Sequence, residues 1–213
     1  MRVIDLSWPM TDGMAVFPGD VTPSVKTGAT IEENGFRTTL LSLSSHAGTH
    51  MDAPAHMMAS GKYLDEMPNE TFFGTAVVAD VRGCAGRRIE LADIKVSSNE
   101  VACASFLLFL TGWSRNWGKD EYLEGFPTLS PLAAEWVSEQ GLKGVGFDSI
   151  SADPVSSVRC DIHKILLGKG LVIIENLRNL EQTGYMPFCL AALPISILRQ
   201  DGGPARVMAV LDR

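Results

Sequence analysis

Three of the four histidines in this chain of 213 residues lie in one short stretch, at positions 46, 50 and 56. An aspartate, Asp52, stands between the second and the third. Two neutral imidazoles and a carboxylate form a ligand set that both Zn²⁺ and Mn²⁺ accept, with room left for water. His46, His50 and Asp52 are therefore candidate metal ligands.

The alternative is that these are ordinary loop histidines whose ring nitrogens bond to backbone carbonyl groups. A lone histidine would favour that interpretation, but a cluster of histidines around an aspartate is typical of metal coordination or catalysis. The alternative would also leave the polar groups of His46 and Asp52 without partners near a core edge. The spacing therefore favours a metal or catalytic site.

The fourth histidine, His163, lies far along the chain, and twelve residues later Glu175 ends the apolar run 171–174. A carboxylate that closes a buried strand is costly unless it is paired. Glu175 is either a strand-end residue bonded to a helix N-terminus or an arginine, or a ligand. In the second case, it would join His163 in a second metal site that shares Asp52.

Local sequence also indicates how the cluster is positioned. Residues 38–44 alternate polar and apolar side chains, which predicts a strand that ends where the cluster begins. Gly48 and Pro54 both oppose a continuous helix, so we expect His46 and His50 to lie on a folded loop. Gly48 would let the backbone turn tightly between the two imidazoles, and Pro54 would stiffen the exit.

The rest of the chain predicts a mixed α/β class in one domain, residues 1–213. Short apolar runs bounded by Gly, Pro, Asp or Asn predict further strands. They cover 1–6, 75–81, 104–111, 144–147, 170–175, 190–197 and 206–211. Helices are predicted at 90–96, 130–140 and 161–167, and a turn at 200–204 would join the last two strands into a hairpin.

Composition excludes several function classes. A net charge of -7 argues against nucleic acid as a partner, because such binders cluster Lys and Arg along the phosphates. The apolar runs are too short to cross a bilayer, and the N-terminal residues lack the pattern of a secretory signal. Four scattered cysteines, with no C-x-x-C pair, indicate reduced thiols and a cytoplasmic location. Small molecules are the expected partners.

The stretch His46–His56, which reads HAGTHMDAPAH, resembles the H-x-G-T-H-x-D-x-P-x-H signature of the cyclase family, which includes bacterial kynurenine formamidases and isatin hydrolases. Other segments resemble the family in the same order along the chain. They are IDLS at 4–7, FPGD at 17–20, GFDS at 146–149, the surroundings of His163, ENL at 175–177, LP at 193–194 and GGPAR at 202–206. The resemblance therefore runs nearly from end to end.

This resemblance implies a swivelling β/β/α fold, with mixed β-sheets and peripheral helices, in a metal-dependent hydrolase that assembles as a homo-oligomer, a dimer or a tetramer. By matching positions, His46, His50 and Asp52 would hold one metal ion, and Asp52 would bridge to a second ion held by His163 and Glu175. The expected cofactor is one or two divalent ions, Zn²⁺ or Mn²⁺. His56 matches the histidine that serves as acid/base beside the metal.

The expected reaction is hydrolysis of a carbon–nitrogen bond other than a peptide, in an aryl formamide of the N-formylkynurenine kind or in a cyclic amide or lactam. Attack by metal-bound hydroxide, with His56 moving the proton, would accomplish it. Phe17 is a candidate for the pocket wall, and Cys160 is expected to be a buried structural thiol. A cyclase or dehydratase using the same groups, and a non-catalytic metal-dependent binding module, are the alternatives.

Overall fold

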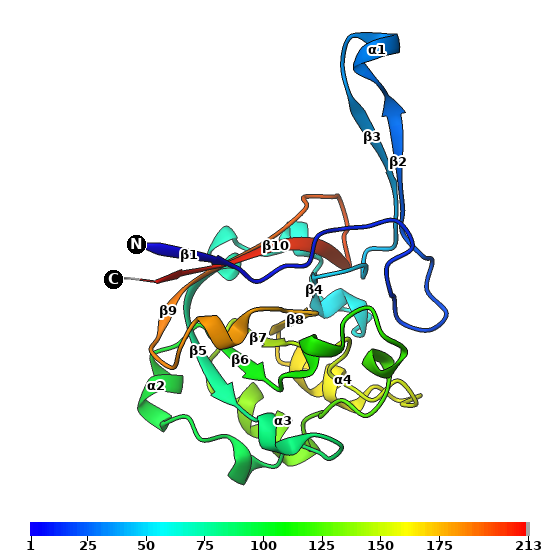
Figure 1. The fold of residues 1–213 in the computed structure, drawn as a ribbon. Coiled ribbons are helices and arrows are strands. Elements are labelled where there is room, and N and C mark those ends of the chain that lie inside the picture. The colour runs from blue at the N-terminus through cyan, green and yellow to red at the C-terminus, as the bar shows by residue number, and fades with distance from the viewer. Residues whose placement is uncertain (212–213) are drawn as a thin grey trace.

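The computed structural model describes residues 1–211, which form one eight-stranded sheet and a separate two-stranded ribbon (Figure 1). The large sheet has the strand order β1-β10-β4-β8-β7-β6-β5-β9, and β9 pairs with β10 as well. The sheet therefore curls until its far strand meets β10. The single domain predicted for residues 1–213 ends with two residues that lie outside the described part.

The strands are β1 (Arg2–Asp5), β2 (Ser24–Ala29), β3 (Thr38–Ser42), β4 (His50–Asp52), β5 (Phe73–Asp80), β6 (Phe106–Leu110), β7 (Gly144–Phe147), β8 (Val172–Glu175), β9 (Phe188–Pro194) and β10 (Gly202–Leu211). The helices are α1 (Ile31–Asn34), α2 (Ser98–Ala102), α3 (Pro131–Ser138) and α4 (Asp161–Gly168). In the described part of the chain, no helix is long and apolar enough to cross a membrane.

The centre of the sheet is buried on both faces. Strands β5 to β8 run parallel, and all five residues of β6 are buried. Because side chains alternate along a strand, Leu107 and Phe109 face α3 and α4, whereas Phe106 and Leu108 face the curled half of the sheet formed by β9 and β10. The predicted mixed α/β class, with mixed strands and peripheral helices, is confirmed.

Helix α3 follows the start and stop signals of its sequence. The Ser130 hydroxyl accepts a hydrogen bond from the Ala133 N–H at 3.3 Å, and Pro131 occupies the first helical position. Gly141 then adopts a φ of 73°, a conformation that other residues resist. The helix predicted at 130–140 is thus confirmed, with slightly shorter bounds.

The predicted helix at 90–96 is wrong. Only one 3₁₀ turn forms there, at Leu91–Asp93. The Asp93 carboxylate accepts from the Glu90 N–H at 2.9 Å and binds the Arg87 guanidinium at 2.6 Å. These side-chain bonds hold the turn in place of a continued helix. The short helix α2, which follows, was not predicted.

Two predictions around the histidine cluster also need correction. His50–Asp52 is not loop but strand β4, because β10 and β8 supply ladder partners on both of its sides. The turn predicted at 200–204 ends at Asp201, since Gly202, Gly203 and Pro204 already pair with β4. The antiparallel pairing of β9 with β10, which that turn predicted, is confirmed.

A projecting segment departs from the compact part of the molecule. We call residues 24–42 the arm; it consists of β2, α1 and β3, of which only β3 was predicted. The two strands pair with each other in a separate sheet, and no residue of either is buried. Figure 1 shows the arm standing well away from the body.

Removing a large side chain from the centre of the sheet should destabilise the protein strongly. Phe109 is fully buried and its ring stacks on Phe147 with centroids 5.2 Å apart. We expect Phe109→Ala to lower the free energy of unfolding by about 3–5 kcal/mol, measured by urea denaturation. Leu132→Ala, on a side chain that is 62% exposed, is the control and should change it by less than about 0.5 kcal/mol. Equal losses in the two variants would contradict this packing.

Candidate active site

Strand β4 places two of the candidate ligands on one face. His50 and Asp52 are two residues apart, so their side chains point to the same side of the strand, whereas Met51 points into the apolar core. His50 is paired in register with Glu175, the last residue of β8. The His50 Nε2 lies 3.3 Å from an Asp52 oxygen and 3.5 Å from a Glu175 oxygen. A one-residue shift of β4 would turn the two ligands into the core.

His46 reaches the same carboxylate from the turn before β4. Its Nδ1 lies 2.7 Å from the Asp52 Oδ1. Gly48, between the two histidines, has a φ of 66°, and Gly202 on β10 leaves space for the His46 ring. A Cβ at Gly202 would lie only 2.4 Å from the ring carbon Cε1 of His46. The two glycines therefore allow the ring to approach Asp52.

His163 reaches Asp52 and Glu175 from the first turn of α4 (Asp161–Gly168). Its Nε2 lies 3.2 Å from a Glu175 oxygen and 3.7 Å from an Asp52 oxygen. Asp153 caps the start of this helix, because its carboxylate accepts hydrogen bonds from the N–H groups of Ile162 and His163, which have no partner within the helix. The five residues predicted as metal ligands thus converge, although they come from separate segments.

Each of the three imidazoles has its second ring nitrogen held by an outer partner. The His46 Nε2 lies 3.1 Å from an Asp201 oxygen, the His50 Nδ1 lies 2.9 Å from the Gly48 carbonyl, and the His163 Nδ1 lies 2.7 Å from an Asp153 oxygen. Histidine ligands of metals are held in this way, which fixes the tautomer and the ring direction. The nitrogens left facing inward are those aimed at Asp52 and Glu175.

The donor set fits a divalent cation. Asp52 is 1% exposed and Glu175 is 4% exposed, so two carboxylates lie out of water at the centre of the cluster. A cation bound among the inward-facing nitrogens would offset the free-energy cost of burying these two carboxylates. The donor atoms of His50, Asp52 and Glu175 lie within 4.8 Å of one another, and so do those of His46, Asp52 and His56. Asp52 belongs to both groups. They differ from the predicted sets, because one contains His56 and the other places His50 with Glu175.

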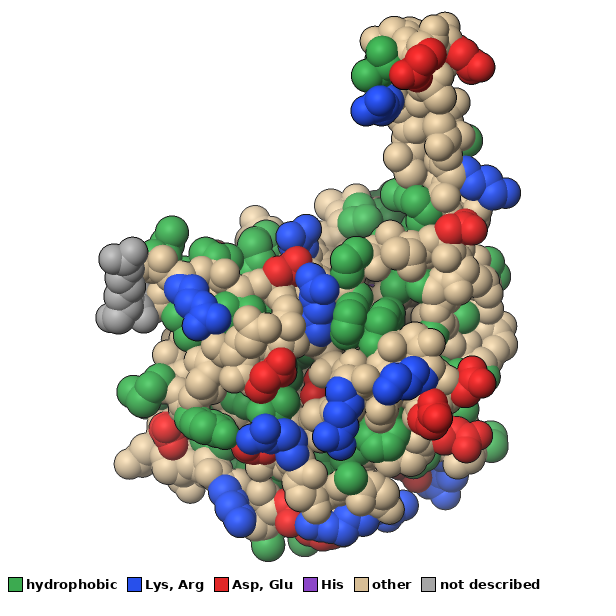
Figure 2. Space-filling model, in the orientation of Figure 1, with side chains coloured by type: hydrophobic (Ala, Val, Ile, Leu, Met, Phe, Trp, Pro, Cys, Tyr) green, Lys and Arg blue, Asp and Glu red, His purple; other side chains and the backbone are tan. Residues whose placement is uncertain are grey.

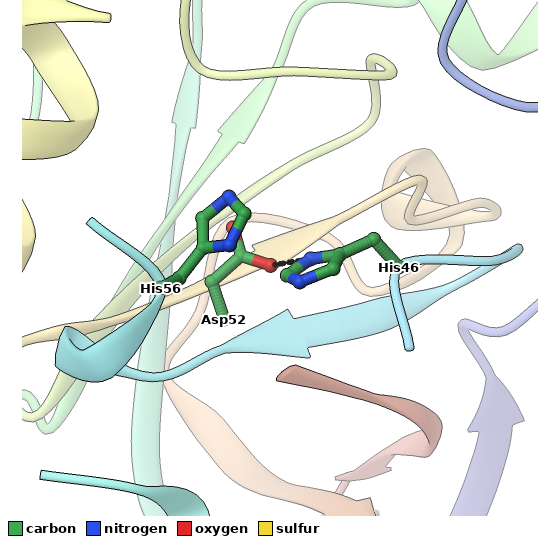
Figure 3. A group of neighbouring side chains, drawn as sticks. All are labelled: His46, Asp52 and His56. Atoms are coloured by element: carbon green, nitrogen blue, oxygen red, sulfur yellow. Dashed lines mark hydrogen bonds and ion pairs between the residues drawn. The ribbon is translucent and has the colours of Figure 1, made fainter. Parts of the chain in front are cut away.

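His56 occupies a different position from the other histidines. It ends the 3₁₀ turn Pro54–His56 just after β4, and its ring centroid lies 4.0 Å from that of His46. Its Nδ1 makes only a long ion-pair contact, 3.6 Å from an Asp201 oxygen. Figure 3 shows His56 and His46 approaching Asp52 from the two segments that flank β4. His56 is thus beside the ligands but held less tightly.

The electrostatic environment separates His56 from His46. Burial lowers the pKa of His56, and the nearby His46 and His163 rings lower it further. Burial also opposes the charged form of His46, but the charge of Asp52 and hydrogen bonds to Asp52 and Asp201 raise its pKa to about 9. Asp52 likewise raises the pKa of His50 against the effect of burial. His56 is therefore the one histidine of the four whose pKa is lowered.

A cavity of about 230 Å³ opens onto these groups. The candidate ligands and His56 line one side, and Phe17, Met57 and Ile150 provide apolar wall. Phe17 therefore lies where its predicted role in the pocket wall requires. Cys160, which was expected to be buried, is instead half-buried and also lines the cavity.

Sequence reasoning missed three residues that position the site: Asp153, Asp201 and Asn176. The Asn176 side chain donates to the Gly48 carbonyl at 2.8 Å, and its own backbone carbonyl accepts from the Thr49 hydroxyl at 2.7 Å. Asp153 precedes a proline and Asp201 lies in the predicted turn, so both resemble ordinary turn residues. Asn176 lies in the segment ENL that resembles the family, but no role was predicted for its side chain.

Comparison with known proteins places the chain in a family. The Cyclase family model matches residues 4–154. The chain is also 32% identical to a kynurenine formamidase from Salinibacter ruber, over 98% of this chain and 97% of that protein. The chain belongs to the Cyclase family.

Two solved structures share this fold over nearly the whole chain. Isatin hydrolase A from Labrenzia aggregata, bound to benzyl benzoate, matches this Cyclase family member with a TM-score of 0.89 and 24% identity, over 100% of this chain and 94% of that one. A predicted metal-dependent hydrolase from Bacillus stearothermophilus matches with a TM-score of 0.79 and 26% identity, over 98% and 97%. The fold implied by the resemblance is confirmed.

A single methyl group on β10 should weaken metal binding by this Cyclase family member. Because a Cβ at Gly202 would collide with His46, we expect Gly202→Ala to lower the affinity for Zn²⁺ by about 10-fold to 100-fold. The measurement is competition with a chelating dye. Gly83→Ala is the control, since nothing lies within 4 Å of its Cβ. Equal affinities in both variants would remove His46 from the ligand set.

Metal affinity should increase as the pH rises from 6.5 toward about 9. The raised pKa of His46 means that the metal-free site holds a proton there at neutral pH, and a cation must displace it. Calorimetric titration with Zn²⁺ at pH 7, in two buffers of different ionisation enthalpy, should show proton release. An enthalpy independent of the buffer would contradict this prediction.

Proposed function

We propose that this protein is a metal-dependent hydrolase that cleaves a non-peptide carbon–nitrogen bond, with an aryl formamide such as N-formylkynurenine as the substrate. The observation that carries the proposal is the surrounding of the buried Asp52 carboxylate. Three imidazoles, each bonded to an outer partner through its second nitrogen, approach this carboxylate. The His56 ring lies beside them and lacks such a short bond. Such a division of roles suits metal-assisted hydrolysis, in which one group moves protons and the others bind the cation.

The proposed ligands are His46, His50 and Asp52 for one ion and Asp52, His163 and Glu175 for a second. Zn²⁺ is the proposed ion, with Mn²⁺ as the alternative, because nitrogen and carboxylate donors suit both. When bound, a divalent ion lowers the pKa of water to about 7 and polarises a carbonyl oxygen. The protein contributes the positions of the imidazoles, which Asp201, the Gly48 carbonyl and Asp153 hold.

His56 is the proposed acid/base. Because burial lowers its pKa, the ring is neutral at neutral pH and is able to accept a proton from the attacking water. As the carbon–nitrogen bond breaks, that proton passes to the departing nitrogen, which is a poor leaving group unless it is protonated. The Asp201 carboxylate, 3.6 Å from the His56 Nδ1, stabilises the ring while it carries the charge.

The apolar wall supports an aromatic substrate. Phe17, Met57 and Ile150 line the same cavity as the polar groups, so a flat ring would contact them while its amide faces His56. The relative from Salinibacter ruber is a kynurenine formamidase, and the neighbour from Labrenzia aggregata is an isatin hydrolase. Both names describe hydrolysis of an amide attached to an aromatic ring.

The proposal also covers the setting of the enzyme. Residues 1–213 form one catalytic domain, and the cytoplasm is the proposed location because the four cysteines are scattered along the chain with no C-x-x-C pair. The proposed partners are a small-molecule amide substrate and further copies of the same chain in a homo-oligomer. A nucleic acid is not among them, given the net charge of -7.

The proposal is tested with purified protein reconstituted with Zn²⁺ or Mn²⁺. We expect formate and free aryl amine from N-formylkynurenine, and ring opening of isatin as a slower reaction. Quantification of formate identifies hydrolysis. A cyclase or dehydratase would leave the carbon–nitrogen bond intact and release water, and a binding module would turn over neither compound. Either result would refute the proposal.

Removal of His56 should abolish chemistry without removing the metal. We expect His56→Ala to lower kcat for N-formylkynurenine by roughly 10²-fold to 10⁴-fold, the usual contribution of a positioned acid/base. Metal content, measured by atomic emission, should equal that of the wild type and is the internal control. Unchanged turnover would exclude the acid/base role, and loss of metal would instead make His56 a ligand.

A further inference from the structure

The backbone carbonyl of Gly48 accepts two hydrogen bonds inside the protein. The His50 Nδ1 lies 2.9 Å from its oxygen, and the Asn176 Nδ2 lies 2.8 Å from it. A carbonyl oxygen only accepts, and it has two lone pairs, so both of its bonding positions are used. The His50 Nδ1 therefore carries a proton, and the Nε2 is the nitrogen that faces Asp52 and Glu175.

The amide of Asn176 is held at its other end by Tyr122. The Tyr122 hydroxyl donates to the Asn176 Oδ1 at 2.7 Å, from the 3₁₀ turn Asp120–Leu123, which lies 54 positions earlier in the chain. Burial raises the pKa of Tyr122 well above its ordinary value, so the phenol keeps its proton and stays a donor. An amide bonded through both its oxygen and its nitrogen cannot rotate without breaking a buried hydrogen bond. The direction of the Asn176 amide is therefore fixed.

The bonds that run from Tyr122 through the Asn176 amide and the Gly48 carbonyl to His50 form one buried network, which we call the Tyr122 network. Tyr122 is fully buried, and Asn176 and His50 are each 3% exposed. The face drawn in Figure 2 shows no histidine among its described side chains. Because water does not reach these groups, it cannot replace a bond that is lost, and each bond depends on the next.

The backbone of Asn176 is held separately from its side chain. Asn176 directly follows β8, and its φ is 59°, in the left-handed region that glycine and asparagine tolerate best. Its N–H donates to the Ser149 carbonyl at 2.9 Å, and its carbonyl accepts from the Thr49 hydroxyl at 2.7 Å. These backbone bonds do not involve the amide, so the role of the amide can be tested without removing the turn.

Tyr122 belongs to the packing behind the site. Its ring meets the Trp117 ring edge to face, with centroids 5.1 Å apart, and it packs with Phe126 and Ile150. Ile150 lines the cavity, but Tyr122 is not among the described residues that do so. The Tyr122 hydroxyl therefore does not touch a substrate in the cavity, and it reaches the site through Asn176.

We propose that Tyr122 is a positioning residue for His50: its hydroxyl fixes the Asn176 amide, and the amide fixes the Gly48 carbonyl that directs the His50 Nε2 at the metal site. Histidine ligands of metals depend on such outer partners. The Tyr122 network extends this support by two bonds beyond the carbonyl that contacts the ring. The proposal rests on His50 as a metal ligand in the proposed function.

Tyr122→Phe tests the hydroxyl alone, because the aromatic ring remains in place. We expect this variant to lower the affinity for Zn²⁺ about tenfold, measured by competition with a chelating dye. Tyr185→Phe is the matched control, because the Tyr185 hydroxyl bonds to the Asp80 carboxylate in an exposed part of the molecule. Its affinity should equal that of the wild type. An unchanged affinity in Tyr122→Phe, or an equal loss in both variants, would overturn the proposal.

A double-mutant cycle distinguishes positioning through Asn176 from a general loss of packing. Asn176→Gly removes the amide, while glycine accepts the left-handed backbone at this position, and we expect it to lower the affinity for Zn²⁺ by about 10-fold to 100-fold. Because Tyr122 acts through this amide, Tyr122→Phe added to Asn176→Gly should cause no further loss. Additive losses would mean that the hydroxyl acts by another route, which contradicts the proposal.

The His50 ring is also observed without metal or substrate, by proton–nitrogen NMR of the full metal-free chain. We expect a slowly exchanging proton on the His50 Nδ1 in the wild type, and exchange with water about tenfold faster in Tyr122→Phe, the effect of losing one buried hydrogen bond. Equal exchange rates would overturn the proposal. This measurement needs neither bound Zn²⁺ nor turnover of N-formylkynurenine, so failure of the positioning role and failure of the proposed function are distinguishable.

Discussion

The site depends on one constraint, the burial of the Asp52 carboxylate. A carboxylate that is 1% exposed needs positive or hydrogen-bonding partners on every side, and here imidazoles from three segments provide them. Together they hold the pKa of Asp52 well below its ordinary value, against the effect of burial. A cation among the same groups would satisfy this requirement more fully, which is why the cluster is suited to metal binding.

The position of strand β4 within the sheet sets the surroundings of the Asp52 carboxylate. Strand β4 has only three residues, yet it lies between β10 and β8 and so receives ladder bonds on both sides. Its register places His50 beside Glu175 and turns Met51 into the core. The pairing of β10 with β4 brings Asp201, which directly precedes β10, to His46 across 155 positions of sequence. The other two outer partners are closer in sequence, because the Gly48 carbonyl lies two residues before His50 and Asp153 lies ten residues before His163.

The outer partners explain why the four histidines are not equivalent. Three have a ring nitrogen bonded within 3.1 Å to a fixed acceptor, whereas the nearest carboxylate of His56 is 3.6 Å away. A tightly held ring suits a ligand, whose direction must not change. A ring with a lowered pKa and a loose partner suits proton transfer, which requires both protonation states to be accessible. The geometry therefore supports the division of roles proposed for them.

The amino-acid sequence alone was enough to predict the candidate residues for the chemistry and most of the buried strands. The histidine spacing is local, and the apolar runs of β6, β7 and β8 are visible because strands buried on both faces have continuous hydrophobic sequence. Helix α3 was predictable from its cap, its proline and its terminal glycine. Each of these signals is contained within a few neighbouring residues.

Tertiary structure decided what local signals do not carry. Strand β4 is too short to show a period, so only its neighbours on β10 and β8 make it a strand. Asp153 and Asp201 resemble turn residues in the sequence, and they became partners of His163 and His46 because the closed sheet and α4 brought them there. The exposure of both faces of the arm likewise follows from its distance from the core. Contacts between remote segments depend on chain topology, which residue spacing alone does not specify.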